Sequence, residues 1–273
     1  MKQRIITTVA LWAALALVLV LFGELGGLVL LVLITTLTQI ETRQMGLTAG
    51  GRDERPLTRL PELMLGWSIL LGSYFSGEAE FAMVTGILLG IVALVPPVTC
   101  LISQREVRSV CARTLYLPWM LHFYVLALQS FDSLWVPIWL IAVAKFNDVG
   151  ALLVGRKLGR HKMAPLTSPG KTWEGAVGGV LGGGLVGFVL GFVPDFQFVT
   201  GLTPGSAFEV ALLLGPVAIV SDLSGSWLKR RARVKDSGTT IPGIGGMLDL
   251  IDSLLLVAPV GYGLLILASR VWN

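Results

Sequence analysis

The chain has 273 residues, of which 54% are hydrophobic and only 14% are charged. Soluble domains carry about 25% charged residues and have shorter apolar runs, so the composition excludes an ordinary soluble enzyme and favours a polytopic membrane protein. The net charge of +4 suits anionic partners such as lipid headgroups and nucleotide phosphates. The two cysteines, Cys100 and Cys111, match the spacing of neither a disulfide framework nor a zinc site.

Apolar runs long enough to cross a bilayer, about 17 to 25 residues, follow one another along the chain. We expect an all-α polytopic integral membrane protein with about nine transmembrane helices. They are expected near residues 5–22, 26–42, 61–77, 81–102, 114–131, 133–150, 174–193, 206–222 and 251–269. The first run is interpreted as a retained span, because no small-residue cleavage motif follows it.

The basic residues predict both the orientation and the division of the chain. Every Lys and Arg except Arg270 falls in alternate loops, and the loops between them carry only acidic residues. By the positive-inside rule, the N-terminus and the basic loops face the cytosol, which for a bacterial protein means the cell inner membrane. We divide the chain into N-terminal transmembrane helices, residues 1–131, and a C-terminal catalytic transmembrane region, residues 132–273. Two of its cytosolic segments, residues 145–175 and 221–253, carry more charge than orientation requires.

Four aspartates lie at the predicted membrane edge of these segments. Asp148 ends the sixth expected span, Asp222 ends the eighth, and Asp249 and Asp252 begin the ninth. Asp249 and Asp252 are three residues apart and would share one face of a helix. Ionisable groups at the edge of the hydrocarbon are costly and usually functional, and carboxylate oxygens suit Mg²⁺. We therefore predict one or two magnesium ions here; the alternative is that each aspartate merely caps or ends its helix.

Cations surround the same aspartates. A basic run follows the eighth expected span and comprises Lys229, Arg230, Arg231, Arg233 and Lys235. Lys171 belongs to the stretch SPGKTWEG, in which Ser168 and a helix N-terminus would bind a phosphate together with the lysine. In the alternative interpretations, Ser168 is an ordinary N-cap with Pro169 at the first helical position, and the basic run anchors the chain to anionic lipids.

Both segments resemble the phosphatidate cytidylyltransferases, also called CDP-diacylglycerol synthases. The resemblance covers roughly the C-terminal half in register, and the N-terminal half only as a set of spans. In the first segment it rests on Asp148, Gly150, Ala151 and the box from Ser168 to Gly175. In the second it rests on Ser226, Leu228, Lys229, Arg230, Lys235, Asp236, Gly238, Ile241, Pro242, Gly245, Gly246, Met247, Asp249, Ile251 and Asp252.

The resemblance implies transfer of CMP from CTP to phosphatidate in the membrane, giving CDP-diacylglycerol and pyrophosphate. It implies a site facing the cytosol, with Mg²⁺ held by Asp148, Asp222, Asp249 and Asp252. The implied catalytic residues are Lys229, Arg230, Lys235, Asp236 and Asp249, and the implied substrate-binding residues are Ser168, Lys171, Lys229 and Arg230. No nucleic acid partner is expected, while an additional K⁺ ion and a homodimer are left open.

Three residues depart from the family pattern. Ile244 replaces a histidine, Leu250 replaces the arginine between two aspartates, and Gly225 stands where many members have glutamate. Because the ligand-type residues remain, we favour a working paralogue. The alternatives are a paralogue acting on another lipid phosphate and a non-catalytic protein that binds lipid or nucleotide.

Two other functional classes are less well supported. A transporter of anionic metabolites should have polar or broken-helix sites near mid-membrane, but the expected spans are mostly apolar there. The glycine-rich stretch GAVGGVLGGGLVGFVLG is better explained by close helix packing than by a broken helix. A CDP-alcohol phosphotransferase would carry an Asp-Gly-x-x-Ala-Arg motif, which the sequence lacks.

Overall fold

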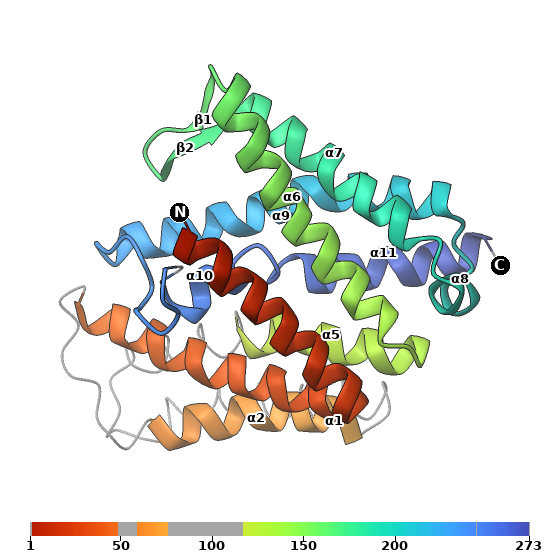
Figure 1. The fold of residues 1–273 in the computed structure, drawn as a ribbon. Helices are drawn as coiled ribbons and strands as arrows, with labels where there is room; N and C mark the ends of the chain where they lie inside the picture. Colours follow the sequence, from red (N-terminus) through yellow and green to blue (C-terminus); the bar gives the residue numbers. More distant parts are fainter. Residues whose placement is uncertain (1, 49–58, 76–116, 244, 273) are drawn as a thin grey trace. The chain divides into compact units, whose positions relative to one another are not determined.

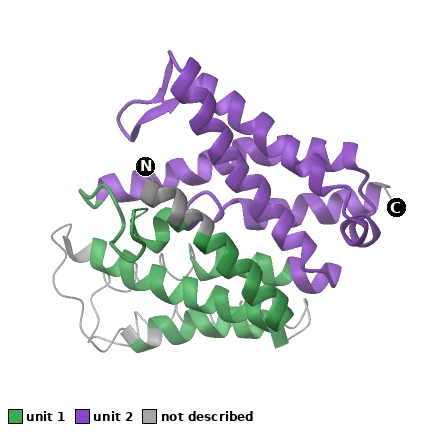
Figure 2. Cartoon of the chain, in the orientation of Figure 1, with its two compact units in different colours: residues 1–126, 232–249 green, residues 127–231, 250–273 purple. Residues whose placement is uncertain are grey.

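The structure is a computed structural model that describes residues 2–48, 59–75, 117–243 and 245–272 (Figure 1). Most of the described residues are helical, and the sheet among them is one two-stranded hairpin. The chain forms two compact units (Figure 2). Unit 1 comprises residues 1–126 and 232–249, and unit 2 comprises residues 127–231 and 250–273.

Unit 1 is built mainly on two helices from the N-terminal part of the chain, α1 (Lys2–Thr48) and α2 (Arg59–Phe75). The two spans expected over residues 5–22 and 26–42 are joined into α1 across a kink at Gly23, where φ is 56° and ψ is −135°. Glycine adopts this left-handed φ without steric cost. The two expected helices are therefore separated by a bend within α1 rather than by a loop.

Polar side chains connect α1 with α2 inside unit 1. The Arg43 guanidinium lies 3.5 Å from the Glu62 carboxylate, and both side chains are buried. Gln39 donates from its amide to the carbonyl oxygen of Glu62 at 3.3 Å. Buried charges are stable only when paired, so these contacts fix the end of α1 against α2.

Unit 2 consists of helices and one hairpin, which connects the end of α6 to the start of α7. α5 (Pro118–Phe131) begins in unit 1 and ends in unit 2, and the short helix α10 (Met247–Ile251) likewise crosses the boundary. The remaining elements of unit 2 are α6 (Trp135–Leu158), β1 (Lys162–Ala164), β2 (Ser168–Thr172), α7 (Trp173–Leu190), α8 (Pro194–Thr200), α9 (Pro204–Arg231) and α11 (Val257–Trp272).

Glycines let α6 and α7 pack backbone to backbone. A Cβ atom added at Gly179 would lie 2.7 Å from the carbonyl oxygen of Asn147, and one at Gly150 would meet the carbonyl of Gly178 at 2.5 Å. Real Cβ atoms do not approach so closely, so these positions require glycine. Close packing of the glycine-rich span, as predicted, is confirmed, and α7 runs unbroken, which rules out a broken helix there.

Helix ends differ most from expectation. α6 continues to Leu158 rather than ending near residue 150, and α9 continues to Arg231 rather than ending near residue 222. The basic run therefore begins inside α9. A hydropathy window detects only the apolar part of a helix, and it misses turns that continue with charged side chains.

The last helix begins later than predicted. α11 begins at Val257, so it was wrong to place Asp249 and Asp252 at the start of the final span. Asp249 lies in the five-residue helix α10, and Asp252 lies in the turn after it. The Asp252 side chain accepts a hydrogen bond from the backbone amide of Ser253 at 2.9 Å. Such local bonding competes with helix continuation.

The stretch SPGKT is a strand, not the first turn of a helix. β2 pairs antiparallel with β1, with Lys162 opposite Thr172 and Ala164 opposite Ser168. The N-cap of α7 is Thr172, whose hydroxyl accepts from the Gly175 amide at 3.1 Å. The interpretation of Ser168 as the N-cap is therefore wrong, because Ser168 pairs with Ala164 in the hairpin and α7 begins only at Trp173.

Four helices in the described part of the chain are long and apolar enough to cross a membrane. They are Ala10–Met45, Trp135–Leu158, Trp173–Leu190 and Pro204–Arg231. The span expected over residues 81–102 lies outside the described residues. The chain is thus a nearly all-α membrane protein.

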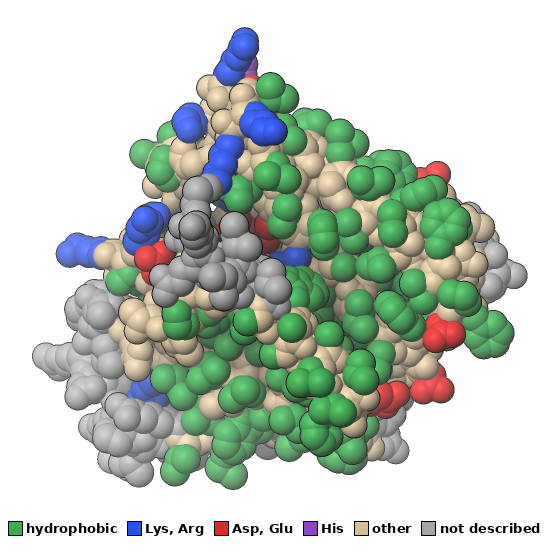
Figure 3. All heavy atoms as spheres, viewed as in Figure 1, with side chains coloured by type: hydrophobic (Ala, Val, Ile, Leu, Met, Phe, Trp, Pro, Cys, Tyr) green, Lys and Arg blue, Asp and Glu red, His purple; other side chains and the backbone are tan. Residues whose placement is uncertain are grey.

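Charge is polarised along the helices of unit 2. α7 runs antiparallel to both α6 and α9, as the order of their glycine contacts requires. Arg156 and Lys157 in the last turn of α6 therefore lie at the same end as Lys229, Arg230 and Arg231 in the last turn of α9. In Figure 3, Lys and Arg side chains gather over the hairpin end. This end of unit 2 is suited to anionic ligands.

Candidate functional site

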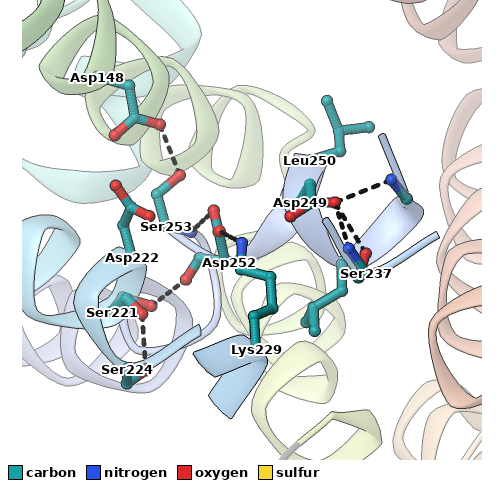
Figure 4. A network of polar contacts seen from close by, with 12 residues as sticks. Asp148, Ser221, Asp222, Ser224, Lys229, Ser237, Asp249, Leu250, Asp252 and Ser253 are labelled. Carbon is teal, nitrogen blue, oxygen red and sulfur yellow. Dashed lines mark hydrogen bonds and ion pairs between the residues drawn. The ribbon is translucent and has the colours of Figure 1, made fainter. Parts of the chain in front are cut away.

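Three aspartates in unit 2 each form an ion pair with a lysine at the basic end of the helices. They come from α6, from α9 and from the turn after α10 (Figure 4). The pairs are Lys145–Asp148 at 3.5 Å, Lys171–Asp222 at 2.6 Å and Lys229–Asp252 at 3.1 Å. Three of the four aspartates singled out from the sequence thus lie near one another in unit 2. With three acids and three bases, the cluster is formally neutral.

Asp148 is held by its own helix and by the turn after α10. Lys145 lies three residues before it on α6, so both side chains project from one face. Ser253 donates from its hydroxyl to Asp148 Oδ2 at 2.8 Å and accepts from the Lys145 ammonium at 2.9 Å. The same ammonium donates to the carbonyl oxygen of Leu250. Lys145 thus fixes the backbone between α10 and α11 as well as Asp148.

The hairpin carries Lys171 to α9. The Lys171 ammonium lies 2.6 Å from Asp222 Oδ2 and 3.5 Å from the carbonyl oxygen of Ile219. Beside this pair is a cavity of about 260 Å³, lined by Asp148, Lys171 and Asp222 and by the apolar residues Ala151, Met163 and Ile219. A charged end and an apolar wall in one cavity suit a ligand that carries both characters.

Asp252 is the most deeply buried of the three acids. Its side chain is 9% exposed, and its carboxylate accepts from Lys229 at 3.1 Å. Ser221 donates to the backbone carbonyl of Asp252, which joins the turn to α9. Burial first, and repulsion from Asp222 second, raise the pKa of Asp252 to about 7, although Lys229 and Lys145 oppose the shift. Negative charge at Asp252 is therefore only partly compensated.

These carboxylates fit Mg²⁺ by their chemistry. Mg²⁺ usually binds one or two protein carboxylates and completes its octahedron with water and phosphate oxygens. Within the described ranges, no three carboxylate, imidazole or thiol groups form a preassembled metal cage. The aspartates are instead paired with lysines, and the raised pKa of Asp252 indicates charge that a divalent cation would neutralise. Such a site would bind the ion together with a phosphate ligand.

Asp249 belongs to unit 1 and has different partners. Its Oδ2 atom accepts three hydrogen bonds, from the Ser237 amide at 2.8 Å, the Ser237 hydroxyl at 3.0 Å and the Gly246 amide at 2.9 Å. Lys235 and Asp236, in the same unit, are exposed. Asp249, Lys235 and Asp236 thus belong to unit 1, whereas the residues of the lysine–aspartate cluster belong to unit 2.

Two other predicted residues lie around the hairpin of unit 2. Arg230 donates from Nε to the carbonyl oxygen of Thr167 at 3.3 Å, which ties the end of α9 to the loop between β1 and β2. Ser168 begins β2 and is half-buried.

The three departures from the resembled family differ in their structural setting. A Cβ atom at Gly225 would lie 2.7 Å from the Cβ atom of Asp252, so glycine at this position lets α9 pack directly on the aspartate. Leu250, where the family has arginine, offers its carbonyl to the Lys145 ammonium. Ile244 lies outside the described residues.

Three residues of the cluster were not predicted. Lys145 was counted only as a basic loop residue, and the hydroxyls of Ser221 and Ser253 were not considered. Each lies within three residues of a predicted aspartate in the sequence. Serine next to a membrane-edge aspartate was the available signal.

Comparisons with known proteins cover nearly the whole chain. The model of the cytidylyltransferase family matches residues 2–268. The phosphatidate cytidylyltransferase of Bacillus subtilis is 34% identical over 281 aligned residues, covering 98% of this chain and 99% of that protein. The phosphatidate cytidylyltransferase of Rickettsia felis is 30% identical, covering 76% of this chain and 80% of that protein. The one of Brucella suis is 41% identical, covering 46% and 44%.

Proposed function

The chain belongs to the cytidylyltransferase family, and we propose that it transfers CMP from CTP to phosphatidate, giving CDP-diacylglycerol and pyrophosphate. Family membership agrees with the resemblance drawn from the two signature segments. The observation that carries the proposed chemistry is the cluster of three lysine–aspartate pairs at the basic end of unit 2.

The reaction makes modest demands on a protein. A phosphate oxygen of phosphatidate attacks the α-phosphorus of CTP, and the bond from that phosphorus to the oxygen bridging to the β-phosphate breaks. The attacking oxygen is already ionised near neutral pH, so no general base is required. Catalysis then consists of positioning the two phosphates and neutralising their charge. The ammonium and carboxylate groups of the cluster would supply both.

The lysine–aspartate pairs suggest how charge is exchanged on binding. In the free protein, each ammonium is held by a carboxylate at 2.6 to 3.5 Å. We propose that nucleotide phosphates take over the ammonium groups of Lys171 and Lys229. The carboxylates of Asp148, Asp222 and Asp252 then become available to a divalent cation. When bound, Mg²⁺ would supply neutralisation of the phosphate oxygens.

The remaining predicted residues keep the roles assigned from sequence. Asp249 is proposed as a further metal ligand, and an additional K⁺ is an open element of the proposal. Arg230 and Lys235 would offset charge that develops on the departing pyrophosphate. Ser168 would hold a substrate phosphate from the start of β2, the strand that also carries Lys171. Asp236 is retained as a candidate catalytic residue without an assigned contact.

The membrane setting fits the two substrates. The outward side chains of α6 and α7 are largely apolar, among them Leu152, Leu153, Val177 and Leu181, and they suit acyl chains of a lipid. The basic end suits CTP arriving from water. By the positive-inside rule, we propose that this end and the N-terminus face the cytosol.

The test is transfer of labelled CMP from CTP into organic-extractable lipid by purified protein in phosphatidate micelles with Mg²⁺. We expect transfer by the wild type and a loss of at least about 100-fold in Asp222→Asn, because a carboxylate proposed to hold the divalent cation is removed. The matched control is Asp195→Asn, an exposed aspartate on α8, which should behave as wild type. Absence of transfer by folded wild-type protein that binds CTP would refute phosphatidate as the acceptor, and other lipid phosphates would then be assayed.

A further inference from the structure

Glu41 is a buried carboxylate of α1 that belongs to no signature motif. Its side chain is 3% exposed, within unit 1, and it reaches a segment that lies far away in the sequence, residues 237–248. Its Oε1 atom accepts from the Thr240 hydroxyl at 2.5 Å and the Met247 amide at 2.7 Å. Its Oε2 atom accepts from the Ser237 hydroxyl at 3.0 Å and the Leu248 amide at 3.1 Å. One carboxylate thus gathers four donors of this segment.

Two glycines of the signature lie directly against the Glu41 carboxylate. A Cβ atom at Gly238 would lie 3.0 Å from Glu41 Oε1, and one at Gly246 would overlap Oε2 and the Ser237 hydroxyl. Side chains at these positions would displace the carboxylate. Glycine at these two positions therefore leaves room for the Glu41 side chain of α1 as well as for any ligand.

One of these donors, the Ser237 hydroxyl, is shared with Asp249. The Ser237 hydroxyl lies 3.0 Å from Glu41 Oε2 and 3.0 Å from Asp249 Oδ2. The Met247 and Leu248 amides that Glu41 accepts from are at the start of α10, which contains Asp249. Amides at a helix start have no partner within the helix, so Glu41 supplies the acceptors and fixes where α10 begins.

We propose that Glu41 is a positioning residue, which holds residues 237–248 in the conformation that presents Asp249. Its part in catalysis rests on the proposed cytidylyl transfer, in which Asp249 is a metal ligand. Glu41 itself touches neither substrate nor metal in this role. Within unit 1, it joins an N-terminal helix to the signature segment, residues 237–248.

Glu41→Gln tests the carboxylate with little change of shape. Each oxygen accepts from one backbone amide, so either orientation of the new amide group points an N–H at another N–H. A buried donor left without an acceptor costs about 1–3 kcal/mol. Thr240→Val is the milder variant, because it removes one hydroxyl donor and leaves both backbone amides in place. Glu24→Gln, on the same helix and only half-buried, is the matched control.

The first measurement is hydrogen exchange of residues 237–248 in detergent-solubilised protein. We expect exchange of the Met247 and Leu248 amides to accelerate roughly 10- to 100-fold in Glu41→Gln, less in Thr240→Val, and not at all in Glu24→Gln. The second is the Mg²⁺ concentration that gives half-maximal CMP transfer. It should rise several-fold in Glu41→Gln, and added Mg²⁺ should recover part of the activity.

A merely structural role would lower the folded fraction without moving the Mg²⁺ half-saturation. Unchanged exchange in both variants, or lower activity with unchanged Mg²⁺ half-saturation, would overturn the positioning role. If the wild type transfers no CMP, the proposed function fails by itself. Exchange then decides whether Glu41 holds the segment, because that measurement needs no substrate.

Discussion

Gly225→Ala is expected to disable the site through a single methyl group. The added Cβ atom would lie 2.7 Å from the Cβ atom of Asp252, whereas non-bonded carbon atoms settle at about 3.5–4.0 Å. The Asp252 Cβ is fixed to the backbone, so α9 or the turn after α10 must shift by about 1 Å. The Lys229–Asp252 contact at 3.1 Å joins the same two elements, α9 and the turn after α10. The shift would therefore disturb it.

The magnitude follows from opposing terms. Overpacking costs about 1–3 kcal/mol, and alanine recovers up to about 1 kcal/mol of helix propensity relative to glycine. The net loss of stability is therefore about 0–2 kcal/mol, and most of the protein should still fold. Misplacement of a catalytic group by about 1 Å costs up to about 100-fold in rate. We expect CMP transfer to fall by about 10- to 100-fold.

The assay measures CMP transfer and thermal unfolding of the same detergent preparation. Gly263→Ala, on α11, is the control, since its Cβ would meet no atom within 4 Å. It should be as active as the wild type and no less stable. Gly225→Ala with activity within twofold of wild type would show that the packing of α9 on Asp252 does not set the geometry of the site.

Three further predictions concern the charges of the cluster. Lys145→Met should lower CMP transfer at least about tenfold, because it removes a charged hydrogen bond to Ser253 and the ion pair with Asp148. The control, Lys157→Met at the exposed end of α6, should leave CMP transfer unchanged. Equal activities of the two variants would refute a role for Lys145. Because burial raises the pKa of Asp252 to about 7, Mg²⁺ must displace a proton below that pH. The Mg²⁺ concentration that half-maximally raises the unfolding temperature should therefore be about tenfold higher near pH 6 than near pH 8. The metal-free protein should lose stability as pH rises toward about 7, since the folded state holds that proton more tightly than the unfolded chain. Equal Mg²⁺ requirements at both pH values would refute the assignment of Asp252 as a ligand.

The sequence carried the parts of the fold that depend on local composition. Apolar runs predicted α2 and α7 closely, and glycine spacing predicted the tight packing of α7, because both signals are continuous along one helix. Helix ends were mispredicted where charged residues continue a helix, as at Arg156 in α6. The SPGK box was taken for a helix start, although its proline and glycine equally suit the edge of a hairpin.

The sequence identified the acidic residues of the cluster but only some of the residues that pair with them. Asp148, Asp222 and Asp252 were found because a carboxylate at a membrane edge is unusual. Their pairing with particular lysines depends on how α6, β2 and α9 are arranged, which no single segment encodes. Glu41 was beyond reach for the same reason, since its donors begin with Ser237, 196 residues away.

Unit 1 is discontinuous in the chain, since residues 232–249 complete a body that begins at the N-terminus. Synthesis runs from the N-terminus, so α1 is made and inserted long before the donors of Glu41 exist. Until residue 248 has emerged, the Glu41 carboxylate must find water, lipid headgroups or an insertion factor as its partner. A nascent chain stopped before residue 232 would therefore contain α1 without the hydrogen-bond partners of Glu41. If N-terminal and C-terminal halves were exchanged between relatives, the two halves would have to match at this contact for unit 1 to fold.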